Sequence, residues 1–117
     1  GTYVDLLTDP ALPRGVNGAG TIHHVAFRTP TDASQVEAHS EVARTGLPIS
    51  PVIDRAYFKS IYYREPSGIL FEIATDQPGF TIDEPAETLG SKLGLPPHLE
   101  PHRAEIEAAL PPLTTAP

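Results

Sequence analysis

Two adjacent histidines and a later glutamate are the residues of this sequence best suited to hold a metal ion. His23 and His24 lie in a β-prone segment, and Glu72 follows His24 by 48 residues in a second such segment. Side chains alternate between the two faces of a strand, so only one of the two histidines can share a face with Glu72. An imidazole and a carboxylate on one face supply two of the three ligands of a two-histidine, one-carboxylate Fe(II) site. The spacing alone favours a structural histidine and a surface acid over a pair of metal ligands.

The segments that must position these residues read as strands. Runs of β-branched and aromatic residues alternate with turn signals, and residues 65–68 (EPSG) form the clearest turn. Together they predict four strands, at residues 21–29, 50–54, 57–64 and 69–75.

A helix is predicted between the first two strands. It runs over residues 33–45, with Thr31 or Asp32 as the N-cap and Gly46 at its C-terminal end. Its apolar stripe is thin, which predicts a surface helix with one covered face; the stripe consists of Val36, Ala43 and Leu47. The resulting β-α-β-β-β order over residues 21–78 predicts an α+β module whose sheet leaves one face open for a second module.

The first nine residues repeat the pattern of the last strand. Residues 1–9 (GTYVDLLTD) align without gaps on residues 68–76 (GILFEIATD), which places Asp5 opposite Glu72. We therefore expect residues 1–9 to hold the last strand of a preceding module that is otherwise missing, with residues 10–20 as a linker. Asp5 is not expected to be a ligand.

Composition narrows the classes of partner. The 117 residues carry a net charge of −7 without a cluster of basic residues, which argues against nucleic acid and acidic membranes as partners. No apolar run approaches the roughly 20 residues of a membrane span. The absence of cysteine is compatible with a cytoplasmic location. Residues 79–117 read as a proline-rich tail with a helix near 100–110.

Two sequence motifs resemble those of the vicinal-oxygen-chelate superfamily, which includes glyoxalase I, bleomycin-resistance proteins and extradiol dioxygenases. Residues 22–28 (IHHVAFR) are similar to the motif of its first strand. Residues 65–72 (EPSGILFE) are similar to the motif of its fourth strand, in which the ligand carboxylate lies four residues after the glycine. The predicted βαβββ order is also that of the superfamily.

A narrower resemblance is to the hydroquinone-type ring-cleaving dioxygenases. It extends over residues 51–58 and 71–80 and into the tail at Leu89-Gly90, Leu95–Pro97, Glu100 and residues 110–113 (LPPL). The resemblance implies that His24 and Glu72 are ligands of Fe(II), with Mn(II) as an alternative metal. It also implies that His23, Arg55 and Tyr62 are catalytic residues around an aromatic diol and O2.

The sequence departs from the family pattern in one respect. The remaining histidine ligand of the family comes from the first strand of an N-terminal module that this sequence lacks. His39, His98 and His102 are expected at the surface instead. The resemblance therefore implies that the N-terminal part of the same protein, or a second chain in a homo-oligomer, supplies the third ligand, and that this chain alone is inactive.

Two other functions remain open at this point. The first is a glyoxalase-type isomerase or lyase, in which the same ligands hold a metal that acts as a Lewis acid without O2. The second is a metal-free small-molecule binding or resistance module, in which His24 and Glu72 are dispensable.

Overall fold

A computed structural model describes residues 3–5, 7–13 and 15–111 of the chain. The chain divides into two compact units, Gly1–Pro78 and Gly79–Pro117.

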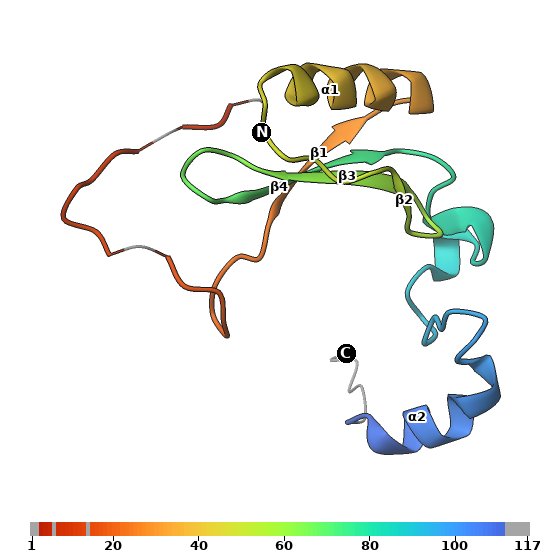
Figure 1. The fold of residues 1–117 in the computed structure, drawn as a ribbon. Coiled ribbons are helices and arrows are strands. Elements are labelled where there is room, and N and C mark those ends of the chain that lie inside the picture. The colour runs from red at the N-terminus through yellow and green to blue at the C-terminus, as the bar shows by residue number, and fades with distance from the viewer. Residues whose placement is uncertain (1–2, 6, 14, 112–117) are drawn as a thin grey trace. The chain divides into compact units, whose positions relative to one another are not determined.

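The first unit is built on one mixed four-stranded sheet in the order β1-β4-β3-β2 (Figure 1). The two edge strands flank an antiparallel central pair, and β1 runs parallel to β4. This is the predicted α+β module, and the fold prediction is confirmed. The strands are β1 (Val25–Thr29), β2 (Ile53–Asp54), β3 (Lys59–Arg64) and β4 (Leu70–Thr75).

The first strand is shorter than predicted. Residues 21–24 were expected in it, but β1 begins at Val25, which pairs with Phe71. In this parallel register His24 would lie opposite Leu70, the first residue of β4, and residues further upstream would lie opposite the turn before it, where the ladder of hydrogen bonds ends. His23 and His24 therefore lie immediately before the strand rather than within it.

Helix α1 (Asp32–Arg44) forms where the sequence predicts it. Thr31 is the N-cap and forms a capping box with Ser34, while Gly46 follows the helix with a φ of +80°. Figure 1 shows α1 lying along one face of the sheet.

Two of the three residues predicted to form the apolar stripe are exposed, and the third, Leu47, is half-buried beyond the end of α1. Val36 is 58% exposed and Ala43 is also exposed, whereas Gln35 is 1% exposed. Gln35 reaches the interior because its amide nitrogen donates to two strand carbonyls, those of Lys59 at 2.7 Å and Ile73 at 2.8 Å. A polar side chain can be buried at this position because both of its donor hydrogens are satisfied.

The two faces of the sheet differ in chemistry. Cross-strand partners share a face, and the ring of Phe71 makes edge-to-face contacts with Phe27 and Tyr63, at centroid distances of 5.2 and 5.7 Å. On the alternate positions, which face the other way, Tyr62 is paired with Glu72, and Ala26 is the partner of Glu72 from β1. The second face is therefore the one that carries the polar candidate residues.

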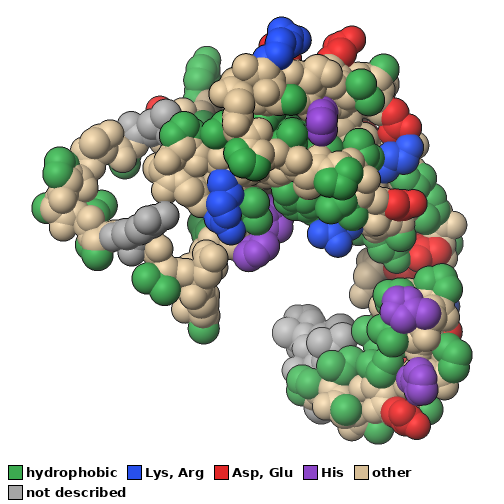
Figure 2. Space-filling view, in the orientation of Figure 1, with side chains coloured by type: hydrophobic (Ala, Val, Ile, Leu, Met, Phe, Trp, Pro, Cys, Tyr) green, Lys and Arg blue, Asp and Glu red, His purple; other side chains and the backbone are tan. Residues whose placement is uncertain are grey.

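Several large hydrophobic side chains of the first unit are exposed. They include Ile22, Val25, Val52 and Ile69. Figure 2 shows hydrophobic side chains spread over the visible surface. Exposed hydrophobic side chains that are scattered singly are normal on a protein surface, so these residues do not by themselves mark an interface.

The N-terminal segment does not form the expected strand. Residues 3–5 and 7 have no regular secondary structure, and residues 1, 2 and 6 lie outside the described residues. Strand geometry requires a neighbouring strand to accept its hydrogen bonds. The assignment of residues 1–9 to a preceding module stays a prediction.

The second unit contains short helical elements. They are η1 (Phe80–Ile82), η2 (Ala86–Thr88), η3 (Glu100–His102) and α2 (Arg103–Ala109). The helix predicted near 100–110 is thus present, with a 3-10 turn at its start. Within the part of the chain that the structure describes, no helix has both the length and the apolar character of a membrane span. The end of the predicted tail motif, Pro112-Leu113, lies outside the described residues.

Candidate metal centre

His24 and Glu72 meet on the sheet face opposite α1. The His24 Nε2 atom lies 2.8 Å from Glu72 Oε2. Their approach follows from the register, because Ala26 is the strand partner of Glu72 and His24 lies two residues upstream on the same face. The side chain of Glu72 is 4% exposed and that of His24 is 36% exposed. The pair therefore forms the edge of a site that is closed on the carboxylate side and open on the imidazole side.

Ser60 also contacts the carboxylate of Glu72, and it was not among the residues predicted from the sequence. Its hydroxyl donates to Glu72 Oε1, and the residue is fully buried. Ser60 lies two residues before Tyr62, so strand alternation places it on the face of Glu72. That alternation was the signal in the sequence, but a serine in a strand has no distinctive pattern of its own.

His23 contacts His24 rather than Glu72. The two Nδ1 atoms are 2.8 Å apart, and the rings meet edge to face with centroids 5.1 Å apart. One Nδ1 must carry the proton and the other must accept it. The contact therefore links the tautomers of the two imidazoles.

Arg55 and Tyr62 lie on the other side of His24. The Tyr62 ring packs edge to face with the His24 ring at a centroid distance of 6.3 Å. The Tyr62 hydroxyl accepts from Nε and Nη2 of Arg55, both at 3.3 Å, and the guanidinium carbon lies 5.4 Å from the ring centroid. All five residues singled out in the sequence thus belong to one chain of contacts, which runs from His23 through His24 to Glu72 and through Tyr62 to Arg55.

The donor atoms are compatible with a divalent metal ion. Two adjacent ligands that each lie about 2.1 Å from one ion are separated by about 3 Å. The 2.8 Å between His24 Nε2 and Glu72 Oε2 is close to this separation. Among the described residues, however, no group of three His, Cys, Asp or Glu side chains could hold a metal. The described residues therefore bring together two candidate ligands, and their role as ligands stays a prediction.

The other histidines lie elsewhere. His98 and His102 are exposed in the second unit, as expected. His39 differs from expectation because it is half-buried on α1, where its Nε2 lies 3.2 Å from the carbonyl oxygen of Ser50.

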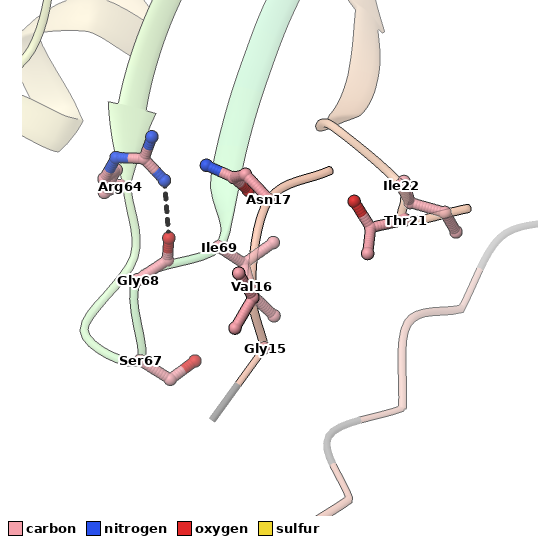
Figure 3. A pocket seen from close by; sticks show the side chains of 9 residues that line it. All are labelled: Gly15, Val16, Asn17, Thr21, Ile22, Arg64, Ser67, Gly68 and Ile69. Atoms are coloured by element: carbon pink, nitrogen blue, oxygen red, sulfur yellow. Dashed lines mark hydrogen bonds between the residues drawn. The ribbon is translucent and has the colours of Figure 1, made fainter. Parts of the chain in front are cut away.

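A cavity of about 410 Å³ lies away from these residues. Figure 3 shows that this half-open cavity lies between linker residues such as Val16 and Asn17 and the β3–β4 turn. Its charged lining residue is Arg64, whose Nη1 donates to the Gly68 carbonyl at 2.7 Å. None of the predicted site residues lines it, so it is not the candidate metal centre.

Comparison with known proteins defines the class. The profile of the Glyoxalase/Bleomycin resistance protein/Dioxygenase superfamily matches residues 1–73. The chain belongs to this superfamily.

Individual relatives show which subgroup of the superfamily this chain resembles. The chain is 50% identical over 110 residues to MhqO of Bacillus subtilis (strain 168), which is named as a candidate ring-cleaving dioxygenase; the match covers 94% of this chain and 35% of MhqO. It is 40% identical over 90 residues to a chlorohydroquinone/hydroquinone 1,2-dioxygenase of Sphingobium indicum, covering 76% of this chain and 28% of that protein. These relatives confirm the resemblance to the hydroquinone-type subgroup.

A solved structure is also similar to this chain. A crystal structure from Bacillus subtilis subsp. subtilis str. 168, titled as a candidate dioxygenase, matches with a TM-score of 0.77 at 51% identity. The match covers 84% of this chain and 32% of that one. The chain thus spans about a third of the length of the relatives that it matches.

Proposed function

We propose that this chain is the metal-binding C-terminal part of an Fe(II)-dependent ring-cleaving dioxygenase that acts on hydroquinones or catechols. The observation that carries the proposal is the 2.8 Å approach of His24 Nε2 to a buried Glu72 carboxylate on the open face of the sheet. The names of the similar proteins support the reaction class. Iron, with manganese as the alternative, would supply the redox chemistry and open positions for the aromatic diol and O2.

The histidine pair suits this role. To offer the lone pair of Nε2, His24 must carry its proton on Nδ1, and that proton is then donated to Nδ1 of His23. A hydrogen bond to the second ring nitrogen fixes the tautomer and orientation of a metal-binding histidine. His23 therefore acts on His24, and its own Nε2–H remains available to a bound substrate.

Arg55 and Tyr62 suit binding of a diol anion beside the metal ligands. The guanidinium of Arg55 is a permanent cation, so it stabilises a phenolate or a developing negative charge. Because Arg55 donates to the Tyr62 hydroxyl oxygen, the hydroxyl proton of Tyr62 is left to donate to an oxygen of the substrate.

The third ligand is expected from outside the described residues. A histidine of an N-terminal part of the same protein, or of a second chain in a homo-oligomer, would complete the site. The partly exposed imidazole of His24 leaves the site accessible to a ligand from either source. The reading frame upstream of the Gly1 codon distinguishes them, because a further module with a histidine in its first strand would support the same-chain source.

The proposal is tested by oxygen uptake. The full-length protein, which includes the part expected to supply the third ligand, is loaded anaerobically with Fe(II) and is expected to consume O2 when hydroquinone is added. In that protein His24→Ala and Glu72→Gln are expected to abolish the uptake and the bound iron. His98→Ala and Glu41→Gln are matched controls, since both residues are exposed and neither is among the residues that contact the pair. Wild-type protein that binds Fe(II) but consumes no O2 with hydroquinone or catechol would sink the dioxygenase assignment.

The same preparations discriminate the alternatives. Isomerisation of a thiohemiacetal without O2 consumption would indicate a glyoxalase-type enzyme. Undiminished small-molecule binding by metal-free His24→Ala and Glu72→Gln variants would indicate a binding or resistance module.

A further inference from the structure

Ser60 and Gln35 form a buried framework behind Glu72. Ser60 is fully buried, Gln35 is 1% exposed, and Glu72 is 3% exposed. The hydroxyl of Ser60 donates to Glu72 Oε1, while Glu72 Oε2 faces His24. The two oxygens of the carboxylate therefore have different partners, Ser60 for Oε1 and His24 for Oε2.

The backbone on which Ser60 and Glu72 lie is held from the opposite face of the sheet. Gln35 of α1 donates to the carbonyl of Lys59, the residue before Ser60, and to the carbonyl of Ile73, the residue after Glu72. The backbone of Lys59 makes a second hydrogen bond to a side chain, because its N–H donates to the Thr75 hydroxyl at 2.9 Å. One amide side chain thus links the peptide group that precedes Ser60 to the carbonyl of the residue that follows Glu72.

We propose that Ser60 is a positioning residue that leaves Glu72 a single oxygen, Oε2, for the metal, and that Gln35 fixes the backbone of both residues. The inference rests on the proposed function of Glu72 as a ligand. A carboxylate that binds through one oxygen occupies one coordination position rather than two, and so leaves more positions open for substrate and O2. Hydrogen bonds to a ligand carboxylate also fix its orientation, and their loss typically lowers metal affinity about 10- to 100-fold.

The primary test is metal binding by the whole protein without substrate. Titration of the metal-free protein with Mn(II) and with Co(II) is expected to give a dissociation constant about 10- to 100-fold higher for Ser60→Ala than for wild type. The Co(II) absorption spectrum of Ser60→Ala is expected to shift, because the freed Oε1 can then also reach the ion. Ser60→Thr keeps the hydroxyl and is expected to restore both affinity and spectrum toward wild type.

A matched control separates this role from general loss of a buried hydroxyl. Thr29 is a buried strand residue whose hydroxyl contacts that of Ser34, so Thr29→Val removes a buried hydroxyl without touching Glu72. It is expected to bind Mn(II) and Co(II) as wild type does. Circular dichroism of each variant verifies that the sheet has formed.

The outcomes are distinguishable. If wild type binds neither metal, the proposed function fails and the inference fails with it. If wild type binds metal and Ser60→Ala binds equally well with an unchanged Co(II) spectrum, only the inference fails. If Ser60→Ala does not fold, a metal affinity of folded Ser60→Thr near that of wild type supports the inference. If folded Gln35→Met has the metal affinity and the Co(II) spectrum of wild type, the part of the inference assigned to Gln35 is refuted.

Discussion

The Nε2 atom of His24 lies 2.8 Å from Oε2 of Glu72, although the two residues are 48 positions apart in the sequence. The parallel pairing of β1 with β4 brings them together, with Ala26 opposite Glu72. The imidazole lies just before the strand and is partly exposed, whereas the carboxylate lies within a central strand and is buried. The carboxylate is therefore the fixed half of the candidate metal centre, and the imidazole is the half with freedom to adjust.

The two histidines are predicted to differ in the effect of their removal. His24→Ala deletes a proposed ligand and should abolish tight binding of Mn(II), whereas His23→Ala removes only the hydrogen-bond partner of His24 Nδ1 and should weaken binding about 10- to 100-fold. Calorimetric titration of the metal-free protein measures both. A larger loss for His23→Ala than for His24→Ala would mean that the ligand had been assigned to the wrong histidine.

Tyr62 is predicted to matter for the rate of the reaction rather than for metal binding. Tyr62→Phe removes the hydroxyl that Arg55 contacts and should lower kcat about 100-fold or more, the usual range for loss of a proton donor, with Mn(II) affinity unchanged. Tyr63→Phe is the matched control, because the adjacent ring packs against Phe71 on the opposite face. Equal rates for Tyr62→Phe and wild type would reduce Tyr62 to a packing residue.

Gln35 is predicted to be a major contributor to stability. Gln35→Met keeps the length of the side chain but removes the donor for two buried carbonyls, which should lower the free energy of unfolding by about 2–4 kcal/mol. Val36→Met at the exposed neighbouring position should change it by no more than about 0.5 kcal/mol. Urea unfolding monitored by circular dichroism gives both values, and similar midpoints for the two variants would contradict the assignment.

Glu65 is predicted to make the β3–β4 turn sensitive to acid. Its pKa is held below the usual range by the hydroxyl of Ser67, which donates at 2.5 Å, and by the N–H groups of Ser67 and Ile69. A carboxyl whose pKa is lower in the folded than in the unfolded state stabilises the fold above its unfolded pKa of about 4.3, and this contribution is lost as the pH falls through the folded pKa.

Glu65→Gln should therefore be less stable than wild type at pH 7, and the difference should shrink as the pH is lowered toward 2. Urea unfolding across this range measures the difference, and an NMR titration of the Glu65 carboxyl measures its pKa directly. Glu37→Gln, at an exposed position on α1, provides the comparison. A difference between wild type and Glu65→Gln that does not depend on pH would exclude the role of the charge.

Local features of the sequence were sufficient to predict the order of the helix and strands. The Thr31 cap, the glycine at position 46 and the turn at residues 65–68 act over a few residues, so the helix and the hairpin could be predicted within a few positions. The five candidate residues could also be selected, because motif resemblance identified Arg55 and Tyr62, which spacing alone left undistinguished. The strand pairing that makes β1 begin at Val25 could not be predicted, since it depends on where β4 begins.

Tertiary structure alone decided which polar residues are buried. The sequence determined a βαβββ module with a histidine and a carboxylate on one face, because alternation along a strand and capping of a helix are local properties. Burial of Gln35 in place of Val36, and the contact of Ser60 with Glu72, depend on backbone groups of strands distant in sequence. A polar side chain is stable in the interior only where such partners satisfy it, and those partners exist only once the sheet has formed.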